Sequence, residues 1–122
     1  MKDRLKKIEI ENFVWLIYIG IIILSFYANE KEKKFIINND EISKKEYQNL
    51  LILIFTILLI IYIYFTKDSY NDIKNLNNND SDKKKILTKA SFIGSVLILM
   101  SGIIFLLIAI LDEEIDTEIA FN

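Results

Sequence analysis

The carboxylates of the C-terminal tail are the residues of this sequence with the clearest potential for chemistry. Five of them follow a long apolar run that ends at Leu111, and they are Asp112, Glu113, Glu114, Asp116 and Glu118. On a continued helix, carboxylates four residues apart share a face and can bind a hard cation such as Ca²⁺ together with waters. Acidic side chains at a helix C-terminus also oppose the helix macrodipole. We therefore expect a solvated end over residues 112–122, with cation binding as the alternative.

Nucleophilic and redox chemistry have little support in the composition. The chain has no Cys and no His, which excludes disulfides and thiolate sites and removes the usual general base near neutral pH. A serine and a lysine can form a hydrolytic pair, but every Lys lies at or beyond the ends of the apolar stretches. With three Gly in all, there is no Gly-rich phosphate loop. We expect no enzyme activity, no cofactor and no protein-built metal site.

Three stretches without Asp, Glu, Lys or Arg make up half of the chain, namely residues 12–29, 47–66 and 90–111. As helices they would measure about 27, 30 and 33 Å, close to the ~30 Å hydrocarbon core of a bilayer. They predict an all-α fold: an integral membrane three-helix bundle, up-down-up, forming one membrane domain over residues 1–122. A cleavable signal peptide is the alternative for the first stretch, although "SFYANE" is a poor cleavage site.

Capping signals place the start of the second helix. The stretch "ISKKEY" is typical of a capping box, with Ser43 as the N-cap and Glu46 at the N3 position. The second helix is therefore expected over residues 43–75. Residues 29–42 are left as a loop, in which the apolar island Phe35–Ile37 forms either an extended turn or a segment that dips into the membrane interface.

The third helix follows a strong breaker. The stretch "NLNNNDSD" supplies turn-forming residues, and Asp80, Ser81 or Asp82 is expected to cap a helix over residues 82–111. The second and third helices thus form a long antiparallel hairpin. The first helix is expected over residues 12–29.

Basic residues set the orientation. The N-terminal segment and the second loop together carry ten Lys or Arg, the first loop carries five, and the tail carries none. Because translocation of Lys and Arg is disfavoured, we predict a multi-pass protein of the cell membrane with a cytoplasmic N-terminus and an extracytoplasmic C-terminus. The basic clusters at residues 2–7 and 83–89 would meet anionic headgroups of the lipid bilayer, and no nucleic-acid partner is needed to explain them.

Small residues gather on one side of the third helix. This candidate packing face consists of Ser91, Gly94, Ser95, Ser101, Gly102 and Ala109. Small side chains let helix backbones approach closely, and hydroxyls can form hydrogen bonds across the contact. The face predicts either packing against the first two helices or a seam for a homo-oligomer or a membrane protein partner. The apolar ending "EIAFN", with Ile119 and Phe121, suggests a docking contact of the tail.

The entry "KIEIENFVWLIYI" and the ending "DEEIDTEIAFN" resemble those of small Ile-, Lys- and Asn-rich multi-span membrane proteins of low-GC Gram-positive bacteria. Members with a known role include accessory subunits and bacteriocin-immunity proteins. The resemblance implies a membrane accessory or regulatory subunit that acts through helix–helix contacts, and it brings no catalytic residues. The alternatives are a self-immunity or defence protein and a pore or holin-like oligomer.

Overall fold

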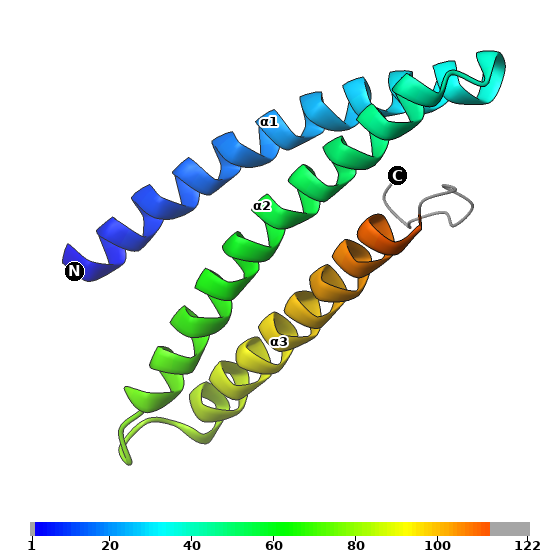
Figure 1. Ribbon diagram of the computed structural model, residues 1–122. Helices are drawn as coiled ribbons and strands as arrows, with labels where there is room; N and C mark the ends of the chain where they lie inside the picture. The colour runs from blue at the N-terminus through cyan, green and yellow to red at the C-terminus, as the bar shows by residue number, and fades with distance from the viewer. Residues whose placement is uncertain (1, 113–122) are drawn as a thin grey trace. The chain divides into compact units, whose positions relative to one another are not determined.

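The computed structural model describes residues 2–112, and these residues form helices joined by two short connections (Figure 1). The helices are α1 (Lys2–Asn38), α2 (Glu41–Lys74) and α3 (Asp82–Leu111). The predicted all-α class is confirmed for the described part of the chain. All three helices are long and apolar enough to cross a membrane.

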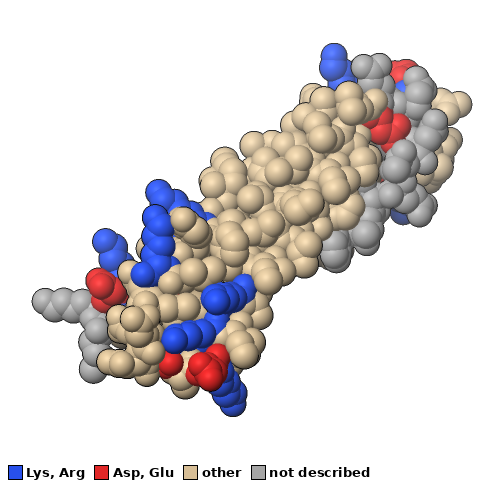
Figure 2. Space-filling view, turned by 90° about the horizontal axis from the view of Figure 1, so that it is seen from below, with Lys and Arg blue, Asp and Glu red and all other residues tan. Residues whose placement is uncertain are grey.

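The helices extend well past the charge-free stretches. They contain 37, 34 and 30 residues, which corresponds to about 55, 51 and 45 Å. Residues 12–29, 47–66 and 90–111 within these helices contain no Asp, Glu, Lys or Arg, and Figure 2 shows uncharged surface between groups of charged side chains. Each helix therefore has an apolar middle about as long as a bilayer is thick, with charged turns at its ends.

The first helix is much longer than the sequence pattern predicted. It runs over residues 2–38 instead of 12–29, and the predicted loop over residues 29–42 is wrong because only Asn39 and Asp40 lie outside the helices. The island Phe35–Ile37 is helical. The flanks contain Lys, Glu, Leu and Ile but no Gly or Pro, so nothing in them stops a helix.

The turn between α1 and α2 is capped by Asp40, not by Ser43 as predicted. One carboxylate oxygen of Asp40 accepts a hydrogen bond from the Ile42 N–H at 3.1 Å, and the other accepts one from the Ser43 hydroxyl at 2.8 Å. The predicted capping box with Ser43 as N-cap is therefore wrong by three positions. Asp is as good an N-cap as Ser, and here it is the residue next to the turn.

Asn39 closes the end of α1 in the left-handed backbone region, with φ of 52°. Because only Gly, and less readily Asn or Asp, adopts this region without a large penalty, Asn39→Val is expected to destabilise the turn by about 1–2 kcal/mol. Asn39→Gly is expected to be neutral or stabilising. Asn38→Val, at an exposed helical position one residue earlier, is the control and should have little effect. Denaturant unfolding in detergent micelles compares the three, and equal behaviour of Asn39→Val and Asn38→Val would contradict the assignment.

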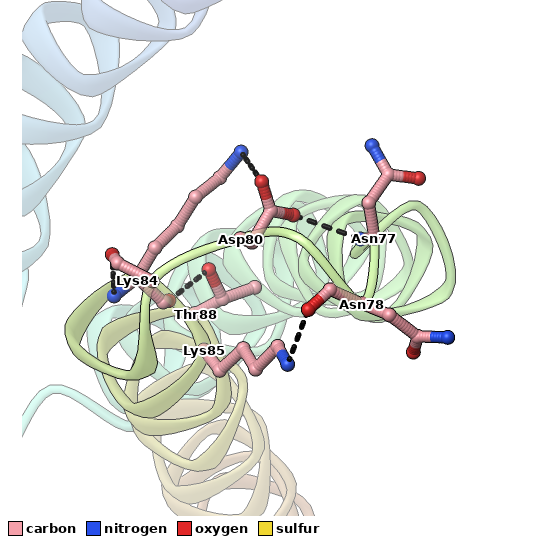
Figure 3. Close-up of polar contacts among 7 residues, drawn as sticks. Asn77, Asn78, Asp80, Lys84, Lys85 and Thr88 are labelled. Carbon is pink, nitrogen blue, oxygen red and sulfur yellow. Dashed lines mark hydrogen bonds and ion pairs between the residues drawn. The ribbon is translucent and has the colours of Figure 1, made fainter.

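The loop between α2 and α3 is held by Ser81 and by Asp80, whose contacts with Asn77 and Lys84 Figure 3 shows. The Ser81 hydroxyl accepts a hydrogen bond from the Lys84 N–H at 3.1 Å, and the Ser81 carbonyl accepts one from the Lys85 N–H at 3.1 Å. Ser81 is thus the N-cap of α3, which is one of the three predicted positions. The predicted bounds of α3, residues 82–111, are confirmed.

The described residues form two compact units, one of residues 2–54 with Asp112 and the other of residues 55–111. In the first unit, the buried apolar residues of α1 recur every seventh position, at Val14, Ile21 and Ala28. On α2 the buried residues Tyr47, Leu51 and Ile54 follow a four-three spacing. Such spacings give each helix one narrow apolar stripe, as in coiled-coil packing.

Candidate helix–helix interface

A polar cluster joins the second half of α2 to α3. The Ser69 and Ser95 hydroxyl oxygens lie 3.0 Å apart and form a hydrogen bond in which either can donate, and the Ser95 hydroxyl also lies 3.0 Å from the Ser91 carbonyl. The Thr66 hydroxyl lies 2.8 Å from the Tyr62 carbonyl and 3.2 Å from the Ser95 carbonyl, and shares its hydrogen between them. Interhelical hydrogen bonds of this kind contribute about 0.6 kcal/mol each within membranes.

Close approach of the two helices depends on Gly102. A Cβ atom at this position would lie 3.0 Å from Cδ2 of Tyr62, 3.4 Å from Cε2 of Tyr62 and 3.6 Å from Cδ1 of Leu59. The first of these distances is shorter than ordinary van der Waals contact between carbon atoms. Gly102 is buried, and a side chain at this position would force the Tyr62 ring to shift.

Aromatic pairs flank the polar cluster and the glycine. Phe55 and Phe105 lie 5.8 Å apart between ring centroids, and Tyr70 and Phe92 lie at the same separation. Phe55, near the start of this part of α2, thus contacts Phe105, near the end of α3. Tyr70, near the end of α2, contacts Phe92, near the start of α3. The pairing is antiparallel, as the hairpin prediction requires for residues 55–111.

We define the α2–α3 seam as the set of residues that make these contacts: Phe55, Leu59, Tyr62, Thr66, Ser69 and Tyr70 on α2, and Phe92, Ser95, Gly102 and Phe105 on α3. The α2 side of the seam was not predicted. Its signal is present, because positions 55, 59, 62, 66 and 69 follow a four-three spacing. The spacing is hard to recognise in the sequence, because the remaining faces of this part of α2 are also occupied by Ile and Leu.

The six predicted small residues of α3 do not share one environment. Ser95 and Gly102 belong to the seam, and Ala109 is buried with an exposed fraction of 4%. Ser91, Gly94 and Ser101 are exposed. A Cβ added at Gly94 would meet nothing within 4 Å. The predicted face is therefore divided between Ser95 and Gly102 in the seam, a buried Ala109, and three exposed residues.

Charged groups outside the apolar stretches stabilise the two turns. Hydrogen bonds from the Asn77 N–H, at 2.8 Å, and from the Lys84 ammonium, at 3.2 Å, lower the pKa of Asp80 from its usual range (Figure 3). The Ser43 hydroxyl and the Ile42 N–H lower the pKa of Asp40 in the same way. A depressed carboxyl pKa stabilises the fold above the ordinary pKa, and this contribution is lost as the pH falls through the folded-state value.

A further ion pair and a cation–π contact join α1 to the start of α2. The Lys31 ammonium lies 2.7 Å from a carboxylate oxygen of Glu46, and the Lys31 side chain is 17% exposed. The Lys44 ammonium lies 5.3 Å from the centroid of the Phe35 ring. Together with the Asp40 cap, these contacts hold the α1–α2 tip, which we define as residues 30–46.

Most of the tail residues with predicted cation binding or docking lie outside the described residues. Asp112 is described, whereas the other tail carboxylates, Ile119 and Phe121 lie outside residues 2–112. Within residues 2–112, no group of three His, Cys, Asp or Glu side chains is placed to hold a metal ion. Cation binding by the tail stays a prediction, as does docking through Ile119 and Phe121.

The fold and the seam define a helical chain with three candidate membrane spans and a close-packed pair of helices. Comparison with known proteins adds no further assignment: no family model, no curated protein and no solved structure matches the chain.

Proposed function

We propose that this chain is a multi-pass membrane protein with a cytoplasmic N-terminus that acts as an accessory or regulatory subunit through helix–helix contacts. Large apolar side chains in the middles of the helices are exposed, for example Trp15 at 64%, Ile60 at 63% and Leu97 at 58%. Water would make such surfaces aggregate, whereas lipid accommodates them. The ten basic residues of the N-terminal segment and the second loop favour the cytoplasmic side for both.

The observation that carries the subunit role is the open small-residue set on α3. Gly94 and Ser101 lie seven residues apart, two turns of one helix face, and both are exposed. Because apolar burial does not drive association between helices in lipid, partners meet where small residues allow backbones to come close. Ser95 and Gly102 allow α2 and α3 to approach closely within the chain. We assign Gly94 and Ser101 the corresponding role in contact with a helix of a second polypeptide.

Copurification in mild detergent tests the role. In the variant Gly94→Leu/Ser101→Leu, the amount of copurified partner or second copy should fall at least about tenfold, since overpacking of a close contact costs about 1–3 kcal/mol. Met100→Leu, an exposed position on another face of α3, is the matched control and should retain the complex. A wild-type chain that stays alone, or a complex that the double variant leaves intact, would contradict the proposal.

A further inference from the structure

Two isoleucines near the end of α1 are exposed beyond the apolar stretches. Ile36 and Ile37 have exposed fractions of 66% and 68%. Since α1 continues without a break after Asn29, they lie about 10 and 12 Å past the end of the first charge-free stretch. The headgroup layer adds only about 5–8 Å on each side of the hydrocarbon core. If α1 crosses the membrane as proposed, these side chains stand in water and lipid does not cover them.

The same part of α1 has a shallow hollow that carries both signs of charge. We define the α1 hollow by the residues that line it, which are Asn29, Glu32, Lys33, Ile36 and Ile37. Glu32 is half-buried and Lys33 is exposed. Neither has an ion-pair partner within residues 2–112. Both charges are therefore available to a partner that presents one positive and one negative group.

The order of the side chains around α1 makes the hollow complementary to itself. Successive residues of a helix are about 100° apart, so Glu32 and Lys33 lie on either side of the line that joins Asn29 and Ile36. A two-fold axis parallel to this line brings one edge of the first copy against the opposite edge of the second. Glu32 of each copy then faces Lys33 of the other, and Ile36 meets its own copy between the two pairs.

The spacing of exposed residues along α1 favours the same arrangement. Ile22, Asn29 and Ile36 recur at every seventh position and are exposed. In parallel two-stranded coiled coils, a single Asn in such an apolar line specifies two helices in register. Its amide can donate to and accept from its copy. Two copies inserted in one membrane with the same orientation present their α1 helices in parallel, as this contact requires.

We propose that the α1 hollow binds the same hollow of a second copy of this chain, about a two-fold axis along the membrane normal. This inference rests on the membrane insertion of the proposed function, because a bilayer gives both copies the same orientation. The hollow contains one Lys and one Glu, so it offers anionic lipid no net attraction. A second copy satisfies both charges and covers Ile36.

A comparable hollow on α2 fits this role less well. It is lined by Glu41, Ile42, Lys45, Glu46 and Asn49. Its two carboxylates already have partners within the chain, since Glu46 lies 2.7 Å from the Lys31 ammonium and Glu41 lies 3.9 Å from that of Lys44. The unpaired charges of the α1 hollow select α1 for the contact between copies.

Disulfide formation between copies in membranes tests the contact. Because the chain has no Cys, the thiol of the single variant Ile36→Cys can form a disulfide only with that of a second copy. Position 36 lies next to the axis, where the two backbones are close enough for a disulfide. We expect dimers to form at least about fivefold faster than with Asn38→Cys, because a disulfide needs Cα atoms within about 7 Å. Position 38 is exposed and lies on the opposite side of α1 at a similar height.

Charge variants in the Ile36→Cys background test the pairing. Glu32→Lys or Lys33→Glu alone places like charges opposite each other in both pairs and should slow dimer formation about fivefold. The double variant Glu32→Lys/Lys33→Glu exchanges the two signs and should restore the parent rate. Coexpression of the two single variants, with tags of different size, should give more of the mixed dimer than of either dimer of identical copies.

The outcomes separate this inference from the proposed function. Equal dimer formation by Ile36→Cys and Asn38→Cys, in a chain that carbonate washing leaves in the membrane, would overturn the contact and leave the proposed function standing. A double variant as slow as the two single variants would also overturn it. So would faster dimer formation with Glu32→Lys, the result expected if anionic lipid occupied the hollow. Release of the chain by carbonate would overturn membrane insertion and this inference together.

Discussion

Replacing Gly102 with leucine is expected to weaken the pairing of α2 with α3 by about 1–3 kcal/mol, the usual cost of forcing extra atoms into a packed contact. A Cβ alone would lie 3.0 Å from Cδ2 of Tyr62, so the Tyr62 side chain must shift to make room for leucine. Leucine is the better helix former by somewhat under 1 kcal/mol, which offsets part of this cost. The steric effect is the larger of the two.

The measurement uses a disulfide across the seam. In the variant Ser69→Cys/Ser95→Cys, the two new thiols replace hydroxyls that lie 3.0 Å apart. Oxidation during a titration with sodium dodecyl sulfate gives the detergent concentration at which α3 leaves α2. Gly102→Leu should lower this midpoint. Gly94→Leu is the matched control, since nothing lies within 4 Å of a Cβ there, and it should leave the midpoint unchanged.

A rescue variant sharpens the interpretation. If the Tyr62 ring is the obstacle, Tyr62→Ala should recover part of the loss caused by Gly102→Leu, although each change alone is destabilising. Such non-additivity is expected only for residues in contact. Equal midpoints for Gly102→Leu and Gly94→Leu, or strictly additive effects of the Tyr62 and Gly102 changes, would show that the seam is not packed as described.

The second large effect concerns exposed apolar residues in the middle of α3. Leu97→Lys/Met100→Lys is expected to disfavour insertion of this helix by about 5–7 kcal/mol, since each Lys near a bilayer centre costs about 2.5–3.5 kcal/mol. Leu97 and Met100 are 58% and 53% exposed. On a surface in water, the same exposed substitutions would each change stability by no more than about 0.5 kcal/mol.

The matched control lies on the same helix outside the charge-free stretch. Ile86 and Leu87 are 65% and 57% exposed, and Ile86→Lys/Leu87→Lys should leave insertion unchanged. Labelling of a cysteine placed at residue 122 with a membrane-impermeant reagent reports the fraction of α3 that has crossed. Equal labelling of both double-lysine variants would contradict a transmembrane α3.

The sequence predicts the helices better than it predicts their ends. The charge-free stretches and the turn-forming run after Lys74 leave few alternatives, and the predicted bounds of α3 are confirmed. The sequence pattern underestimates the length of α1, because charged residues do not by themselves end a helix. They mark the end of the apolar segment only, since residues 30–38 contain good helix formers and the first break comes at Asn39.

The interface was predicted on one helix and missed on the other. Gly102 and Ser95 belong to a set of small residues that gather on one side of α3, whose other positions are mostly Ile, Leu and Phe, so the pattern indicates a contact. On α2 the contact residues include Leu59 and Tyr62, which differ little from their apolar neighbours. In a chain surrounded by lipid, hydrophobic periodicity carries less information than in water, because the outward faces are apolar as well.

The start of α2 could not be predicted from the sequence alone. Asp40 and Ser43 are both good N-caps three residues apart, and Glu46 follows Ser43 at the spacing of a capping box. Only the structure shows that α2 begins at Glu41 and that the Ser43 hydroxyl donates to Asp40 at 2.8 Å. Two N-caps are therefore compatible with the local sequence. The structure has the earlier one, Asp40, and in it Lys31 of α1 forms an ion pair with Glu46 in the second turn of α2.

Sided labelling of the two turns tests the membrane account most directly. Single cysteines at Asn38 and at Asn79, both exposed, are treated in intact cells with a membrane-impermeant maleimide. The account predicts that Asn38→Cys reacts at once and that Asn79→Cys reacts only after the cells are permeabilised. Reaction of both in intact cells, or of Asn79→Cys alone, would contradict it.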